Sequence, residues 1–328
     1  MAPRRFLHVA NGTSTTGTIV SAGIPGHTSI WADPLYEGPV PGNVNDDELR
    51  ETRAAYLTGS LDLDDIEPVN DMRLWRSTIE DRDAYDELVL WYEHDLFDQV
   101  NLIQLLDWID RRGLRTKPVS LVSIGSFPGR PSFKGLGELT PRELAPLFDA
   151  RRPVTDAQCA LAREAWDAFR AATPEPLDDL RRRDTSALPF LAPALERFLQ
   201  EYPWTSDGLS RTERQLLRQA DREGASLAAV FPRMHDGETV YYVTDLSLAS
   251  MADELSRTSP ALLALGPANG GGPLRRHVGS TPAGRAVLEG KQDRVAICGI
   301  DRWLGGVHLR SDGVVWRWDP ARATVART

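Results

Sequence analysis

The sequence predicts an α/β protein with a Rossmann-like, mostly parallel sheet, a helical extension and a smaller winged-helix-like α+β domain at the C-terminal end. Three observations lead to this prediction. Short apolar runs alternate with amphipathic stretches over residues 1–139, as in sheets whose parallel strands are joined by helices. Helix-start signals and prolines dominate residues 140–208. Residues 209–328 continue with three helical stretches and then a hairpin, which is the order of elements in a winged helix.

Two strands and a short helix are expected to form the first β-α-β unit. The later strands and helices are predicted from the spacing of apolar residues along the chain. Apolar runs bounded by turn residues predict strands at 6–10, 28–32, 87–92 and 119–124. About two helical turns fit between the first two strands. A stripe of apolar residues at helical spacing over 102–109 predicts a helix before the last strand. Two shorter helices are expected near 46–58 and 71–83.

Capping boxes are the most specific local signals. A Ser or Thr followed three residues later by Glu or Gln starts a helix, and this pattern occurs at Thr140, Thr155 and Ser210. Proline also follows Thr140 at the first helical position. Further helices are expected near 226–235 and 246–257.

A hairpin and one more helix complete the C-terminal pattern. Strands are expected at 261–265 and 276–279, joined by a glycine-rich turn at 270–272. Thr281 and the following proline open the next helix, and the segment 280–290 resembles the helix after the wing in many bacterial winged-helix domains.

Length and composition are those of an ordinary globular protein. The chain has 328 residues, 41% hydrophobic and 26% charged, which argues against a fibrous or wholly disordered protein. Its two cysteines, Cys159 and Cys298, belong to no CxxC or Cys/His cluster, so neither a disulfide framework nor a local zinc site is predicted. Because no signal peptide or long apolar run is present, we expect a cytoplasmic protein that does not enter a membrane.

Charge is distributed unevenly along the chain. Residues 1–208 contain 22 basic and 34 acidic side chains, a net charge of −12, whereas residues 209–328 contain 16 and 13, a net charge of +3. The acidic excess argues against nucleic-acid binding by the N-terminal part. A charge of +3 supports nucleic-acid binding by the C-terminal part only weakly, since dedicated DNA-binding domains carry a stronger positive patch.

The loop after the first strand is placed like a phosphate-binding loop. Gly12, Ser14 and Gly17 match G-x-G-x-x-G with serine in the second place, and Asp33 ends the next strand, where a dinucleotide fold has its ribose-binding acid. Free N–H groups at a helix N-terminus favour an anion there. The missing middle glycine disfavours NAD. The alternative is an ordinary β-α turn in which Ser14 or Thr15 caps the helix.

The densest group of polar residues, 91–99, lies at the end of a predicted strand, where open α/β sheets bind their ligands. His94 is a candidate general base, with Asp98 or Glu93 to orient it, and a helical backbone would put His94 and Asp98 on one face. Metal ligation by His94, Asp95 and Asp98 is conceivable, but no second histidine lies nearby, so no metal site is predicted. The alternative is structural: Asp95 caps the helix, Asp98 favours its dipole and His94 is a boundary residue.

Two further segments have both a functional and a structural interpretation. Residues 123–129 and 134–137 are either a mobile flap, with Lys134 available to an anion, or an ordinary loop. Near the C-terminus, Arg302, His308 and Arg317 lie beside three tryptophans and are either a base-stacking and phosphate-contacting surface or part of a packed hairpin.

Together these segments predict one ligand cleft at the carboxyl edge of the sheet. The candidate catalytic residues are His94, Asp98 and Asp95, and the candidate ligand-binding residues are Asn11, Gly12, Ser14, Asp33, Glu37 and Gln99. The expected ligand is small and polar, such as a nucleotide or phosphorylated compound, and the sequence identifies no cofactor. The function is either that of a transferase or hydrolase or that of a ligand-sensing regulator, whose C-terminal domain binds DNA or a protein partner.

The N-terminal half resembles the bacterial domain-of-unknown-function 1835 family. The resemblance covers about residues 5–150 and rests on four motifs in order: residues 8–12 with Ser14 and Gly17, residues 31–41, residues 90–99, and residues 135–137. The segment from Leu209 resembles the variable part often attached to that domain. The resemblance implies a known domain without a known reaction, so it transfers no residue roles to this chain.

Overall fold

A five-stranded sheet forms the centre of the N-terminal half in the computed structural model, which describes residues 3–60, 68–222, 224–267, 272 and 274–327. Its first four strands are parallel and the two-residue edge strand is antiparallel. In spatial order the strands are β2 (His27–Ile30), β1 (Phe6–Ala10), β4 (Glu87–Trp91), β5 (Val119–Val122) and β6 (Arg152–Pro153). The predicted α/β class with a mostly parallel sheet is confirmed.

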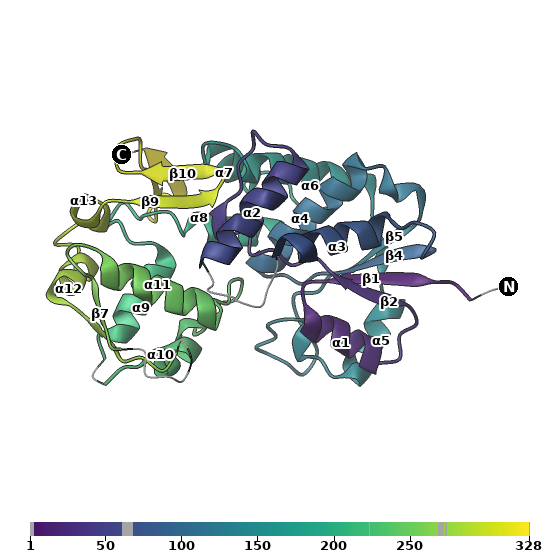
Figure 1. Ribbon diagram of the computed structural model, residues 1–328, viewed down its shortest axis with the longest axis horizontal. Coiled ribbons are helices and arrows are strands. Elements are labelled where there is room, and N and C mark those ends of the chain that lie inside the picture. The colour runs from purple at the N-terminus through teal and green to yellow at the C-terminus, as the bar shows by residue number, and fades with distance from the viewer. Residues whose placement is uncertain (1–2, 61–67, 223, 268–271, 273, 328) are drawn as a thin grey trace.

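Helices cover both faces of this sheet, which explains why β1 and β4 are buried along their whole length (Figure 1). On one face lie α1 (Thr13–Ser21) and α5 (Pro141–Asp149), and on the other lie α3 (Pro68–Glu80), α4 (Leu96–Arg111) and α6 (Asp156–Phe169). Successive side chains of a strand point to opposite faces. Phe6 and Ala10 of β1 therefore belong to the smaller core, and Leu7 and Val9 to the larger one.

The predicted capping boxes are confirmed, but the first helix begins differently. The side chains of Thr140, Thr155 and Ser210 each accept a hydrogen bond at the start of α5, α6 and α9 (Arg211–Ala220), with the reciprocal Glu or Gln contact. Helix α1 instead begins after Gly12 without a side-chain cap. The expectation that Ser14 or Thr15 caps it is wrong, because both lie inside the helix.

Most other elements agree with the predicted ones to within about three residues at each end. The remaining helices of the N-terminal half and the extension are α2 (Asp46–Ser60), α7 (Glu175–Leu180) and α8 (Leu191–Leu199), with short 3-10 turns at Leu114–Thr116 and Leu136–Glu138. No helix in the described parts of the chain is long and apolar enough to cross a membrane.

The C-terminal part contains three helices, a hairpin and further short elements. After α9 come α10 (Leu227–Met234) and α11 (Asp245–Arg257), then the antiparallel pair β7 (Leu263–Leu265) and β8 (Val278–Ser280), and then α12 (Pro282–Leu288) and α13 (Arg294–Cys298). The hairpins β9 (Asp301–Gly305) with β10 (Val307–Arg310), and β11 (Trp316–Asp319) with β12 (Thr324–Arg327), complete the chain. Most of the predicted turn at 270–272 lies outside the described residues.

The last hairpins return to the N-terminal half. Strand β9 pairs in parallel with β3 (Gly38–Pro39), and the Val40 amide donates to the Gly305 carbonyl at 2.8 Å. The larger hydrophobic core is continuous from Leu7 of β1 to Trp318 of β11. The two ends of the chain therefore pack on a common core.

A buried ion pair holds the segment that leads from β2 to β3. The Arg53 guanidinium of α2 contacts both carboxylate oxygens of Asp33 at 2.7–3.1 Å and also donates to the carbonyls of Pro34, Glu37 and Pro39. Both side chains of the pair are almost fully buried. This corrects the expectation that Asp33 binds a ligand, because its carboxylate is fully engaged inside the fold.

We predict that Asp33→Ala strongly destabilises the protein. The substitution leaves the Arg53 guanidinium buried without a counter-charge, which typically costs about 3–5 kcal/mol of unfolding free energy. Urea denaturation followed by tryptophan fluorescence measures the loss. Asp312→Ala is the control: it removes an exposed pair with Arg310, and such pairs contribute roughly 0–1 kcal/mol. Equal losses in the two variants would contradict the structural role of Asp33.

Candidate functional site

Polar side chains meet at the carboxyl ends of β1 and β4, where the strand order of the sheet changes direction. The Asn11 amide donates to Glu93 Oε1 and to Asp98 Oδ2, both at 3.2 Å. The Glu93 backbone N–H donates to the same Asp98 oxygen at 2.8 Å, and the Gln99 amide donates to the Glu93 carbonyl at 2.6 Å. Sequence reasoning placed Asn11, Asp98 and Gln99 at one sheet edge, and the structure brings them together around Glu93.

The segment 135–137 covers this group of residues. The Leu136 N–H donates to Glu93 Oε1 at 3.0 Å, and Ser14 Oγ donates to the Gly137 carbonyl at 3.2 Å. A Cβ on Gly135 would lie only 2.3 Å from Glu93 Oε1, so glycine is what permits the close approach. Asp98 and Glu93 are consequently buried, and direct contact of Asp98 with a ligand in an open cleft is excluded by its position.

Burial favours the protonated forms of the carboxyl groups at this site. Burial raises the pKa of Glu93 to about 7, and burial together with the neighbouring Glu93 charge raises the pKa of Asp98 well above its ordinary value. Burial and the charge of Asp98 act in the same direction on the pKa of Asp95. Two of their oxygens, Glu93 Oε2 and Asp98 Oδ1, are buried and have no hydrogen-bond partner among the described residues.

His94 does not share a helix face with Asp98. Helix α4 begins at Leu96, and Asp95 is its N-cap, with Asp95 Oδ1 accepting from the Asp98 N–H at 2.8 Å. The structural interpretation of Asp95 as a cap is thus confirmed, and the expected i, i+4 pair of His94 and Asp98 is wrong because His94 precedes the helix.

His94 lines a separate cleft of about 690 Å³, which we call the His94 cleft. Its walls come from the loops after β4 and β5, from residues 130–134, from the start of α8, from Pro232 in α10, and from the segment 235–242 between α10 and α11. The Leu96 N–H donates to the Val240 carbonyl at 2.7 Å, which fixes that last segment to the beginning of α4.

The surroundings of His94 favour a neutral imidazole. Its ring stacks on Phe133 at 6.1 Å between centroids and meets Phe190 edge-on at 6.2 Å. Burial lowers the pKa of His94, and nearby backbone groups of Thr239 and Ile124 oppose this only in part. The buried Nδ1 atom has no hydrogen-bond partner among the residues that the structure describes. His94 is half-buried and lines the cleft, so a ligand there can exchange a proton with the part of the ring that faces the cleft, whereas Nδ1 is shielded from it.

Charged side chains line the rest of the cleft. The Lys134 ammonium lies 5.6 Å from the centre of the Tyr242 ring and forms no ion pair with any described residue. In contrast, Arg130 is paired with Glu143 at 2.8 Å, and the buried Glu238 is paired with arginines of α8 and α9. Lys134 is thus the cation best placed to meet an anionic ligand group. The described residues contain no group of three or more His, Cys, Asp or Glu side chains that could hold a metal ion.

The remaining predicted ligand-binding residues lie elsewhere. Gly12 and Ser14 lie at the start of α1, where Ser14 contacts the covering segment. Glu37 lines a smaller cavity of about 130 Å³ together with Tyr36 and Tyr241, and burial raises its pKa. The expectation of one cleft shared by all nine predicted residues is therefore wrong. Sequence reasoning also missed Phe190 and Tyr242, because nothing local indicates that α8 and the α10–α11 connection reach the sheet.

Comparison with known proteins leaves the function to be inferred from geometry. The chain matches no protein-family model and no curated protein sequence at a significant level. The His94 cleft and the buried carboxyl groups beside it are accordingly interpreted from their own contacts.

We predict that stability falls as pH rises through neutrality because of Glu93. A raised pKa means that between about pH 4.5 and 7 the folded state keeps a proton that the unfolded chain has lost, so the free energy of unfolding decreases over this range. Glu93→Gln keeps an oxygen acceptor for Leu136 and removes the titration. The variant should lose less stability between pH 5 and pH 8 and should melt above the parent at pH 8.

Thermal melts at both pH values, with Glu51→Gln on the exposed side of α2 as control, measure this effect. The control should follow the parent. If Glu93→Gln also follows the parent at both pH values, the buried carboxyl pair does not control the pH dependence.

We predict opposite effects for two glycine substitutions near this site. Gly135→Ala places a methyl group against Glu93 and should cost about 1–3 kcal/mol of unfolding free energy through overpacking. Gly17→Ala, in α1, meets no heavy atom within 4 Å outside its own helix and should stabilise the protein by up to about 1 kcal/mol. Chemical denaturation measures both changes. A neutral Gly135→Ala variant would show that the segment 135–137 does not pack closely on Glu93.

Proposed function

We propose that this chain is an enzyme, a transferase or hydrolase, that binds a small polar ligand with an anionic group in the His94 cleft. The observation that carries the proposal is the half-buried imidazole of His94, which lies on the wall of a cleft of about 690 Å³ and whose pKa is lowered by burial. Clefts of this size that combine aromatic walls with a few polar groups are typical of small-ligand sites.

In this proposal His94 acts as general base. A neutral imidazole accepts a proton from a ligand hydroxyl or from water, and burial favours the neutral form by lowering the pKa. Lys134 attracts the anionic group of the ligand, and the rings of Phe133, Phe190 and Tyr242 provide contacts for a planar apolar part. Phosphorylated compounds and nucleotides combine these features, and they form the proposed ligand class.

Asp95 and Asp98 take positioning roles rather than catalytic ones. Asp98 Oδ2 accepts from the backbone N–H of Glu93, and Asp95 Oδ1 accepts from the N–H of Asp98, so the two carboxyl groups fix the backbone on either side of His94. A base that is held by its own backbone keeps its orientation without a direct side-chain partner.

The finer aspects of the fold support a ligand site at this edge. We propose that the sheet is Rossmann-like, since its order β2-β1-β4-β5 places the polar cluster at the point where the order reverses. The order α9, α10, α11, hairpin, α12 supports a winged-helix-like C-terminal domain. The proposed relation of residues 5–150 to the domain-of-unknown-function 1835 family is supported by the contact of two of its motifs, at Glu93 and Leu136.

The alternative, a regulator that binds DNA through residues 209–328, has less support. Arg302 is engaged by Glu213 and Glu254, and Arg317 by Asp293. While these pairs persist, the arginines add no net positive charge to a surface that would bind the phosphates of a duplex. These contacts favour the packed-hairpin interpretation of the tryptophan-rich segment.

We predict that substitutions at His94 and Lys134 separate turnover from binding. A panel of nucleotides and phosphate monoesters is first screened by thermal shift and by phosphate release. For a compound that binds, Lys134→Ala should weaken binding, whereas His94→Gln should leave binding nearly unchanged and reduce turnover by about 10²-fold or more.

His27→Gln, an exposed histidine outside the cleft, is the matched control and should behave as the parent. Melting curves of all variants verify folding. If His94→Gln weakens binding and no compound is turned over by the parent, a sensor is favoured over an enzyme. If both cleft variants bind and react as the parent does, the proposed site is wrong.

A further inference from the structure

A second cavity shares no lining residue with the His94 cleft. The cavity has a volume of about 950 Å³ and lies between α11, α13 and the beginning of β9. Its walls include Ser250, Glu254, Thr258, Arg294 and Cys298. The volume is sufficient for an organic ligand of nucleotide size.

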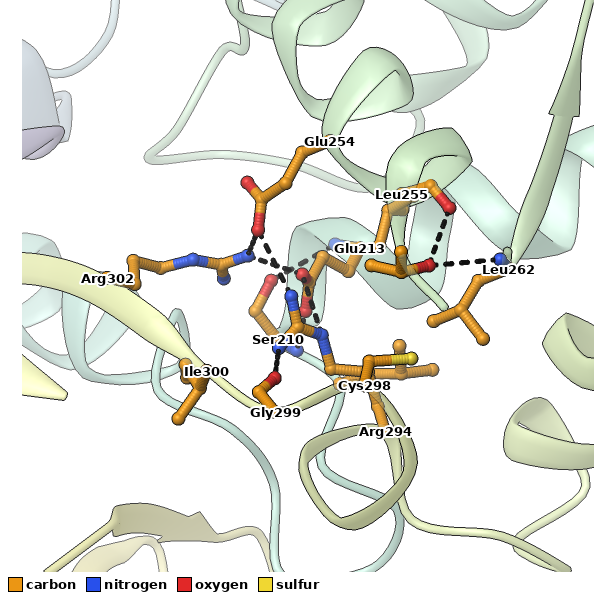
Figure 2. Close-up of polar contacts among 12 residues, drawn as sticks. Ser210, Glu213, Glu254, Leu255, Leu262, Arg294, Cys298, Gly299, Ile300 and Arg302 are labelled. Carbon is orange, nitrogen blue, oxygen red and sulfur yellow. Dashed lines mark hydrogen bonds and ion pairs between the residues drawn. The ribbon is translucent and has the colours of Figure 1, made fainter. Parts of the chain in front are cut away.

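Glu254 and Arg294 on the wall of this cavity belong to a cluster of two arginines and two glutamates, shown in Figure 2, in which Arg302 and Glu213 lie behind the wall. Arg302 and Arg294 converge on the same oxygen, Glu254 Oε1, at 2.7 and 3.1 Å. Arg302 also donates to Glu213 Oε1 at 2.6 Å, and the Arg294 Nε atom lies 3.6 Å from that oxygen. Two guanidinium groups thus face one point on the cavity wall.

The four members of the cluster differ in exposure. The side chains of Glu213 and Arg294 are 1% and 4% exposed, whereas that of Glu254 is 49% exposed. Burial opposes the ionisation of Glu213, but the charges of Arg302 and Arg294 outweigh it and lower its pKa to about 2. Glu213 therefore neutralises one arginine permanently, and the half-exposed Glu254 neutralises the other.

We propose that this cavity is a second ligand site for an organic oxyanion, a carboxylate or a phosphate ester, whose charged group replaces the Glu254 carboxylate between Arg294 and Arg302. The site becomes net positive when Glu254 turns away into solvent. Because Glu254 is half-exposed, water can solvate its carboxylate when it turns away, and the charged group of the ligand then neutralises the arginines in its place.

The arginines that remain are held in place for the ligand. Arg294 Nη1 donates to the Gly299 carbonyl at 2.6 Å, and Arg302 stays bound to Glu213. Arg294 Nε is buried and lies 3.6 Å from Glu213 Oε1, so the buried glutamate also helps to hold this arginine. Guanidinium groups that are fixed before binding recognise carboxylate and phosphate with little loss of entropy.

The other acidic residues of the cavity do not favour a cation instead. Asp253 is paired with Arg276 at 2.8 Å, and Asp301 with His308 at 2.6 Å. Among the described acidic residues of the cavity, Glu254 alone combines exposure with a position between the buried Arg294 and the partly buried Arg302. It also lines the smaller cavity that contains Glu37, so its side chain separates the two cavities.

Removing Glu254 tests the proposal, because the loss of this acidic residue should make anion binding tighter. Inorganic phosphate and citrate are titrated into the full chain by calorimetry and thermal shift, at ionic strength held constant with chloride. Glu254→Ala should bind one of the two anions about tenfold or more tightly than the parent, and its melting temperature should rise further with that anion. A preference for citrate indicates a carboxylate ligand, and a preference for phosphate indicates a phosphate ester.

Two variants control this experiment. Glu289→Ala removes an exposed glutamate outside the cavity that is paired with Lys291, and it should bind as the parent does. Arg302→Gln combined with Glu254→Ala should abolish the gain. Glu254→Gln repeats the comparison at nearly constant side-chain volume if Glu254→Ala does not fold. The proposal is overturned if neither Glu254 variant binds more tightly than the parent, or if the gain survives loss of Arg302.

Discussion

The buried ion pair of Asp33 and Arg53 is the contact on which the joining of the two ends of the chain depends. Arg53 uses its remaining donors on carbonyls of the segment that leads to β3, and Asn101 of α4 exchanges two hydrogen bonds with the Asp33 backbone. Strand β3 is thereby presented to β9, which bears Arg302 of the second cavity. One pair thus links the sheet, two helices and the C-terminal hairpin.

The position where an open α/β sheet usually binds its ligand is occupied by the chain itself. The segment 135–137 covers Glu93 and Asp98, and the two acids hold a proton because they are buried together without a cation. The accessible cleft consequently lies to one side, at His94. The covered acids still matter to that cleft, since they fix the backbone around His94. Because the pair of acids holds a proton, it can fix this backbone without the electrostatic cost of burying two negative charges.

The two proposed sites use different chemistry because their side chains are held differently. His94 is aligned by aromatic rings, and burial favours its neutral form by lowering its pKa, which suits proton transfer. Arg294 and Arg302 are aligned by a buried glutamate and a carbonyl, which suits recognition of a fixed negative charge. Both sites lie where segments that are distant in the sequence meet. Each site includes residues from more than one helix, strand or loop.

The sequence by itself determined the strands, the helix starts and the α/β class, because these depend on side-chain periodicity and on hydrogen bonds within a few residues. The capping boxes at Thr140, Thr155 and Ser210 are of this kind. Only the tertiary structure decided which polar residues are buried and what they contact. Asp33 ends a strand as a ligand-binding acid would, yet it is neutralised by Arg53, twenty positions away. His94 and Phe190 meet through packing of helices whose relative placement no local pattern encodes, because burial and charge pairing depend on residues far apart in the chain.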